Sequence, residues 1–300
     1  MALALAPRRI PTDEGLRHPN LNLTTYLLDK TTPSGRLQRF ALSPKMPLSL
    51  RDHILDLPLQ RFERKEDVAL VAYQMLRGLL AMHQRGVIHT DIKPENLLYD
   101  PNSSRLKLTD FDCSIYASND IRVVMPTRRG TLPFRAPELL LGSVKRFGTA
   151  VDMWSAAVVI AEIGSGEEVF DGDDAASVFA SISDTLGPPN DKQLSELLWP
   201  NSEPEFPLRD EWGRRQRPSP SPRRVRELGK DRERAFYYLG NSMRQLVLNG
   251  LMLFQPSRRL SAGLAGRHQA FACLRNRGPF PCMARPLPFG PGYFNGTSNE

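Results

Sequence analysis

The chain has 300 residues, of which 40% are hydrophobic and 24% charged, so we expect one large domain or two modest lobes that can bury a core. The net charge of +7 suggests a nucleic-acid partner, but the basic excess is concentrated in one run, and we expect no specific nucleic-acid binding. An odd number of cysteines without metal-ligand spacing argues against a disulfide framework, and no apolar stretch reaches the roughly 18 residues of a membrane span. We therefore expect an intracellular protein with no membrane partner, located in the nucleus, the cytoplasm or both.

The front of the chain, residues 1–48, is dotted with prolines and weakly patterned. Two short strands are expected in it, near Leu21–Leu28 and Leu37–Leu42. A helix-like segment follows at Leu48–Leu57. Between Asp67 and Gln84, apolar residues recur at spacings of three and four, which predicts a helix that Gly86 can close in the left-handed conformation.

The next stretch, Val87–Asp100, reads VIHTDIKPENLLYD and places charged and amide side chains between residues that are apolar at nearly every gap. Phosphoryl transfer needs a carboxylate that positions the acceptor hydroxyl, a charge that neutralises phosphate oxygens, and Mg²⁺ held by hard oxygen ligands. Asp91 could take or orient the hydroxyl proton, Lys93 could neutralise the transferring phosphate, and Asn96 offers an amide oxygen to the metal. The spacing of these three residues therefore predicts a catalytic loop for phosphoryl transfer.

A second polar loop follows the segment LKLTDF, Leu106–Phe111, whose alternation predicts a short strand. Asp110 on this turn would supply the ionised carboxylate that the metal requires. The apolar residues of both loops would pin them to a helical body, and preorganisation of this kind supplies much of the rate in electrostatic catalysis. Residues 113–135 then read as a long loop.

The rest of the chain alternates helices with proline-rich segments. Thr149–Ile163 is apolar nearly all round, which is typical of a helix buried on every side. Further helices are expected at Asp173–Leu186 and Ala235–Leu253. The insert at about residues 198–230 holds the run RRQRPSPSPRRVR, which reads either as a solvated or disordered segment or as a patch for nuclear localisation or an acidic partner. The tail, residues 276–300, is expected to be irregular.

Five stretches carry a resemblance to a known family. HTDIKPEN at 89–96, TDF at 109–111, GTLPFRAPE at 130–138, VDMWS at 151–155 and QPSRRLSA at 255–262 occur in the order and spacing of eukaryotic protein kinase catalytic domains. The chain resembles that family over roughly residues 16–275. The resemblance implies an α+β protein kinase-like fold and transfer of phosphate from ATP, with Mg²⁺, to protein substrates. It also implies that Lys93, Asn96 and Asp110 bind the nucleotide and its metal.

The same resemblance implies how the chain is divided. Residues 1–48 would be a remnant of the β-rich N-terminal lobe and the approach to the hinge, and residues 49–275 would be the helical C-terminal lobe with its insert. GLRHPNL at 15–21 resembles the segment that follows the helix of the N-terminal lobe. No G-x-G-x-x-G sequence occurs in the chain, so most of the N-terminal lobe is expected to be missing.

Several residues narrow the resemblance to serine/threonine kinases and, within them, to one group. Lys93 and the structural residue Thr131 are typical of serine/threonine rather than tyrosine kinases. Arg135, just ahead of Ala-Pro-Glu, and LLLG at 139–142 resemble the CMGC group, which includes the cyclin-dependent kinases. In that group an arginine at this position helps to shape a pocket for proline after the phosphorylated residue, although Pro133 stands where an aromatic residue is usual. The implied partners are protein substrates and a cyclin-like or other regulatory protein.

Other residues are expected to have structural roles by the same resemblance. Glu138 and Arg259 would form the ion pair that joins the Ala-Pro-Glu segment to the late part of the domain. Asp152 would brace the backbone of the catalytic loop from the buried helix. His89 would pack in the core.

Two departures from the family lie inside the motifs. Asp112 replaces the glycine of the family's Asp-Phe-Gly, and it is either benign or a sign of relaxed constraint. Thr90 replaces an arginine that in most kinases binds a phosphate on the activation loop. We therefore expect no phosphorylation switch through that contact.

Two functions remain open at this point. The first is an active serine/threonine kinase, which the intact set Asp91, Lys93, Asn96 and Asp110 favours. The second is a pseudokinase or truncated kinase lobe that acts as a protein-binding scaffold, which the missing front end favours. An incomplete gene model would reconcile both observations.

Overall fold

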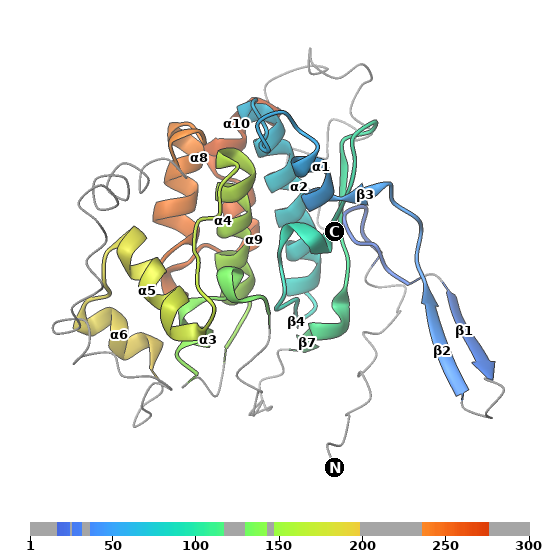
Figure 1. Cartoon of the computed structure of the whole chain (residues 1–300), viewed down its shortest axis with the longest axis horizontal. Helices are drawn as coiled ribbons and strands as arrows, with labels where there is room; N and C mark the ends of the chain where they lie inside the picture. Colours follow the sequence, from blue (N-terminus) through green and yellow to red (C-terminus); the bar gives the residue numbers. More distant parts are fainter. Residues whose placement is uncertain are drawn as a thin grey trace.

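The computed structural model describes residues 17–24, 26–31, 37–116, 130–142, 147–198 and 236–275. The fold is mixed α+β, mostly helical with small sheets (Figure 1). The expectations for the basic insert and for the tail lie outside the described residues. Across the described ranges, no helix has both the length and the apolar character that crossing a bilayer requires.

Two long helices, α2 (Lys65–His83) and α4 (Ala150–Ser165), pack against each other in the middle of the helical body (Figure 1). Both confirm the helices predicted from apolar spacing. α4 is buried from Val151 onward, as its continuous apolar sequence indicates. It ends at Gly166, whose φ of 79° is left-handed and where an added Cβ would lie 2.9 Å from the carbonyl oxygen of Leu59.

Shorter helices accompany this pair. They are α1 (Leu50–Leu55), α3 (Pro137–Leu140), α5 (Ala175–Leu186), α6 (Asp191–Leu197), α8 (Asn241–Leu246), α9 (Ala262–Gly266) and α10 (Ala272–Arg275). α5 confirms a predicted helix. The single helix predicted over Ala235–Leu253 is wrong, because Gly240 interrupts it with a φ of 71°. α8 begins after this glycine and continues into a π-helical turn at Val247–Leu251.

A three-stranded antiparallel sheet joins the two polar loops. Its strand order is β3-β5-β6, with β3 (Leu48–Ser49), β5 (Leu97–Asp100) and β6 (Arg105–Leu108). β3 occupies the start of the segment predicted as helix-like, so that α1 begins only at Leu50. β6 ends before Phe111, where the prediction placed its end, because Asp110 adopts a left-handed conformation with φ 60°.

Two smaller sheets have two strands each. β1 (Tyr26–Thr31) and β2 (Leu37–Leu42) form an antiparallel hairpin, which projects from the helical body in Figure 1. β4 (Val87–Ile88) pairs with β7 (Ile115–Tyr116). β7 lies inside the segment predicted as a long loop, residues 113–135, so this part of the prediction is wrong. The pairing ties the start of the first polar loop to the end of the second.

The segment before β1 packs on the helical body. The predicted strand Leu21–Leu28 is wrong in its first half, because β1 begins at Tyr26 and Leu21 makes only an isolated bridge with Leu108. Asn20 is fully buried, and its Nδ2 donates to Oε1 of Gln74 on α2 at 3.2 Å. This contact between buried amides fixes the segment to α2 and β6.

Candidate active site

Apolar residues anchor the loop between β4 and β5. Val87 and Ile88 are buried in β4, and Ile92 and Leu97 are completely buried inside and at the end of the loop. The polar side chains between these anchors cannot swing out without exposing them. The alternation of apolar and polar residues thus produces a rigid loop whose polar groups face one another.

Asp152, in the first turn of α4, holds the backbone of this loop in place. Its Oδ2 accepts from the backbone N–H of His89 at 2.9 Å, and its Oδ1 accepts from the backbone N–H of Thr90 at 2.8 Å. The predicted contact from Asp152 to the loop backbone is therefore present. A further partner, Nε2 of His83 at 2.8 Å, was missed by the sequence analysis.

His83 was missed because nothing in its local sequence marks a partner. It lies in the last turn of α2, whereas Asp152 is sixty-nine positions later. The only available signal is its place six residues before His89, at the end of a helix that leads directly into the loop. Spacing along the chain cannot reveal a contact between two helices.

His89 packs in the core, as predicted. It is 0% exposed, and its ring lies 5.5 Å from that of Phe111. Burial lowers the pKa of His89, so the neutral ring is favoured at physiological pH. Nε2 then donates to the carbonyl oxygen of Thr109 at 3.0 Å, while Nδ1 accepts from the backbone N–H of Asp91 at 3.4 Å. The ring links the two polar loops.

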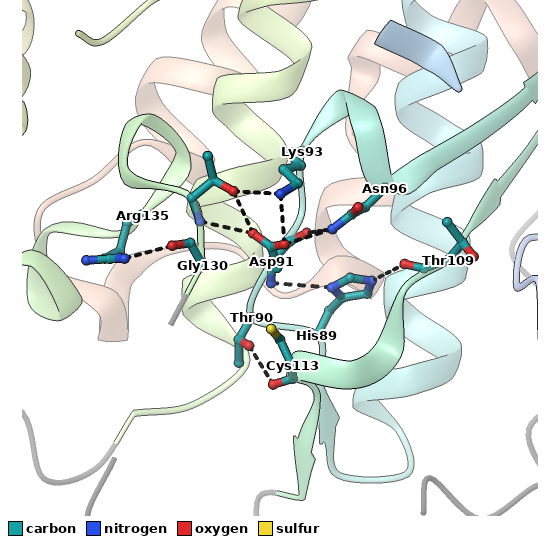
Figure 2. Close-up of polar contacts among 10 residues, drawn as sticks. His89, Thr90, Asp91, Lys93, Asn96, Thr109, Cys113, Gly130 and Arg135 are labelled. Carbon is teal, nitrogen blue, oxygen red and sulfur yellow. Dashed lines mark hydrogen bonds and ion pairs between the residues drawn. The ribbon is translucent and has the colours of Figure 1, made fainter. Parts of the chain in front are cut away.

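Asp91 lies at the centre of the site and receives four hydrogen-bond contacts (Figure 2). Oδ1 accepts from the backbone N–H and the hydroxyl of Thr131, both at 3.0 Å. Oδ2 accepts from Nδ2 of Asn96 at 2.9 Å and lies 3.1 Å from Nζ of Lys93. Burial alone would raise the pKa of Asp91, but these partners outweigh it and lower the pKa below its usual value. Asp91 is therefore an ionised acceptor at neutral pH.

Lys93 and Thr131 complete the ring around this carboxylate. Nζ of Lys93 donates to Oγ1 of Thr131 at 2.8 Å, and its side chain is 22% exposed. The ammonium group is thus held beside Asp91 but remains partly accessible. This is the position from which it could contact a phosphate.

Gly130 allows Thr131 to approach the loop so closely. Its φ of 78° is left-handed, and an added Cβ would lie only 2.6 Å from the carbonyl oxygen of Thr90. Arg135 donates from a guanidinium nitrogen to the carbonyl oxygen of Gly130 at 2.7 Å, which fixes this peptide from the other side (Figure 2). Thr131 and Arg135 were predicted from the sequence, but the need for a glycine at position 130, where the two segments meet, was not.

Asn96 and Asp110 are brought together by the β5–β6 register. Leu97 pairs with Leu108, and just beyond that pair the backbone N–H of Thr109 donates to the carbonyl oxygen of Asn96 at 3.0 Å. Nδ2 of Asn96 contacts both the backbone oxygen of Asp91 at 2.8 Å and its Oδ2, so both amide protons are engaged and the amide oxygen is left as an acceptor. Asp110 follows directly and is exposed.

The donor set of Asn96 and Asp110 fits Mg²⁺. It offers one amide oxygen and one carboxylate, and magnesium is commonly held by one or two protein oxygens together with substrate phosphates and water. The described residues contain no cluster of three or more His, Cys, Asp or Glu side chains that could hold a metal by themselves.

The ion pair expected between Glu138 and Arg259 is present and buried. The two guanidinium nitrogens of Arg259 donate to the two carboxylate oxygens of Glu138 at 2.6 and 2.7 Å. Arg259 also donates to the carbonyl oxygen of Ala150 at 3.0 Å, and its guanidinium lies 5.1 Å from the ring centre of Trp154. The pair therefore fastens α3, the start of α4 and the segment after α8 to one another.

The chain matches the family model described as protein kinase domain over residues 48–271. The match begins at β3 and includes both polar loops, α2 and α4. It spans more than half of the chain.

Proposed function

The chain belongs to the protein kinase domain family, and we propose that it is a serine/threonine kinase that transfers the γ-phosphoryl group of ATP to protein substrates. The observation that carries the proposal is the ring of partners around Asp91, contributed by Lys93, Asn96 and Thr131. Family membership implies protein phosphorylation. The ring supports catalysis by this chain, because it holds an ionised carboxylate next to a partly accessible ammonium group.

In the proposed reaction, Asp91 orients the acceptor hydroxyl and receives its proton as the new oxygen–phosphorus bond forms. The bond between the γ-phosphorus and the β–γ bridging oxygen breaks, and ADP leaves. Its carboxylate already has four partners, so a substrate hydroxyl must replace one of them. The replaceable partners are Nζ of Lys93 and the hydroxyl of Thr131. The N–H of Thr131 is part of the backbone, and Nδ2 of Asn96 is also held by the backbone oxygen of Asp91. Once displaced, Lys93 can contact the transferring phosphate.

ATP supplies the phosphoryl group, and Mg²⁺ bound with it neutralises charge on the phosphate oxygens. Asn96 through its amide oxygen and Asp110 through its carboxylate are the proposed metal ligands. Asn96 also keeps its amide nitrogen on Asp91, which couples the metal-binding side of the site to the hydroxyl-positioning side. Lys93 and these two ligands form the proposed nucleotide contact of the large lobe.

The finer assignment rests on the resemblance to the CMGC group. Arg135 is buried and held against Gly130, a geometry compatible with a preformed substrate pocket beside Thr131. We therefore propose a preference for proline after the phosphorylated serine or threonine. A cyclin-like or other regulatory protein is the proposed partner, and the nucleus or cytoplasm is the proposed location.

The test is phosphotransfer from ATP to three peptide sets: Ser/Thr followed by proline, Ser/Thr without proline, and Tyr. The protein should label the first set most strongly, and Asp91→Ala should give only background. Glu167→Ala removes an exposed carboxylate outside the site and serves as the matched control, with unchanged labelling expected. Equal background from the wild type and Asp91→Ala would contradict catalysis.

A protein-binding scaffold is the second candidate function. It predicts that a partner protein or nucleotide raises the melting temperature without any turnover, because binding to the native state alone stabilises it. The same preparations can therefore decide between the two functions. Stabilisation with no labelled peptide would favour the scaffold.

A further inference from the structure

Thr90 has an unusual backbone conformation for its residue type. Its φ is 69°, and among the described residues it is the only β-branched side chain with a positive φ. Such a conformation is disfavoured for a branched residue and persists only where the surroundings enforce it. Here Asp152 fixes the backbone N–H of Thr90 at 2.8 Å, and Gly130 packs closely against its carbonyl oxygen.

The conformation directs the Thr90 hydroxyl at the second polar loop. Oγ1 donates to the carbonyl oxygen of Cys113 at 2.8 Å, as Figure 2 shows. Cys113 is the last residue of the 3-10 turn Phe111–Cys113, which starts immediately after Asp110. Thr90 is 6% exposed, so water has little access with which to replace this bond.

Two adjacent residues of the catalytic loop thus hold the backbone on either side of Asp110. His89 donates to the carbonyl oxygen of Thr109, one residue before it, and Thr90 donates to that of Cys113, three residues after it. Asp110 itself is exposed and adopts a left-handed conformation with φ 60°. Its backbone is therefore held on both sides by contacts with the catalytic loop, in addition to the β5–β6 pairing that precedes it.

We propose that Thr90 is a positioning residue, whose hydroxyl fixes the Asp110 turn against the catalytic loop. From the sequence alone, Thr90 marks only the replacement of an arginine that in most kinases binds a phosphate on the activation loop. In the structure the residue has a contact of its own, internal to the site, that requires no phosphorylated loop. The consequence for metal binding rests on the proposed function, whereas the consequence for the backbone does not.

The first measurement is amide hydrogen exchange in the metal-free protein. Thr90→Val keeps the branched shape and removes the hydroxyl, while Thr90→Ala and Thr90→Ser form a second pair that differs in the hydroxyl alone. Loss of the hydroxyl should speed exchange at Ser114, whose N–H donates to Phe111 at 2.9 Å across the turn. Exchange in α4 should not change.

Ser183→Ala is the matched control, because it removes a buried hydroxyl-to-carbonyl bond of 2.9 Å inside α5. Exchange at Ser114 should match the wild type in this variant and in Thr90→Ser. Unchanged exchange at Ser114 in both Thr90→Val and Thr90→Ala would overturn the proposal.

The second measurement is the apparent dissociation constant of Mg²⁺ in the presence of ATP. It should rise about 2- to 10-fold in Thr90→Val, the usual effect of one hydrogen bond, and recover in Thr90→Ser. The melting temperature of Thr90→Val should fall no more than that of Ser183→Ala, which loses a buried bond of the same type. A constant that is equal in all variants, despite faster exchange, would overturn the role in metal binding. Faster exchange in a protein that binds no Mg²⁺ and ATP would support the backbone contact and contradict the proposed function.

Discussion

The two ends of α4 each bury a carboxylate, and the surroundings of the two differ. Asp152, in the first turn, is 0% exposed and faces the N–H groups of His89 and Thr90 and the ring of His83. Glu162, near the last turn, is 6% exposed, and its Oε1 has no hydrogen-bond partner in the described part of the chain. Burial raises the pKa of Glu162 to about 8.

The difference shows that the number of hydrogen-bond donors around a buried carboxylate decides whether it can hold neighbouring groups in place. A carboxylate that gains several donors orients the groups around it, whereas one without them is better neutralised by a proton. Asp91 belongs to the first kind, because its partners lower its pKa despite burial. The site is therefore built where donors converge, and each of the following substitutions changes either a buried carboxylate or a donor that faces one.

The largest effect is expected for Arg259→Met, which removes both guanidinium donors from buried Glu138. Stability should fall by about 3–5 kcal/mol in urea denaturation, because a charge is left buried without its partner. The double variant with Glu138→Leu should recover part of the loss; a single variant within about 1 kcal/mol of the wild type would refute this.

Asp152→Ala should lower the free energy of unfolding by about 3 kcal/mol, because it leaves the N–H groups of His89 and Thr90 buried without an acceptor. Urea denaturation measures the loss. Asp152→Asn keeps one acceptor oxygen and should lose less. Equal losses in the two variants would contradict this account, because Asn keeps the volume of the side chain and one acceptor oxygen.

Glu162→Gln should remove a pH dependence rather than a contact. The folded pKa of Glu162, about 8, lies above its ordinary value of 4.5, so its contribution to stability is complete below 4.5 and is lost as the pH rises through 8. From about pH 5.5 to about pH 7.5 the wild type should lose about 2–3 kcal/mol relative to Glu162→Gln. Parallel curves of unfolding free energy against pH would contradict the raised pKa.

Thr131→Val should have the smallest effect on stability, about 1 kcal/mol, because it removes one hydroxyl from the ring around Asp91. The pKa of Asp91 should move upward when this donor is lost. The acid limb of the kcat/KM profile should therefore shift to higher pH, and Thr131→Ser should restore it. If the acid limb of the kcat/KM profile stays at the same pH in Thr131→Val, the hydroxyl of Thr131 does not lower the pKa of Asp91.

Local patterns predicted the parts of the fold whose causes are local. The 3- and 4-residue apolar spacing identified α2, and the continuous apolar run identified α4 as buried on all sides. The spacing of Asp91, Lys93 and Asn96 likewise identified three residues that meet in space. In each case the residues that make up the pattern lie within one short stretch of the chain.

The sequence predictions failed where distant contacts or backbone conformation decide the structure. The break at Gly240 and the end of β6 before Asp110 depend on residues with positive φ, which apolar spacing does not register. The partnership of His83 with Asp152 joins two helices that are far apart in the sequence. The bond from Thr90 to Cys113 likewise needs the two loops to be assembled first.

The most direct measurement is the rate of phosphoryl transfer from ATP to a Ser/Thr-Pro peptide by the wild type and by Asp91→Asn at equal concentration. Asn preserves the shape of the side chain but cannot accept the hydroxyl proton. The rate should fall about 10²- to 10⁴-fold, the usual contribution of a general base, while the melting temperature changes little. Equal rates for the two proteins, or no transfer by either, would contradict the proposal that Asp91 is the catalytic residue of an assembled kinase site.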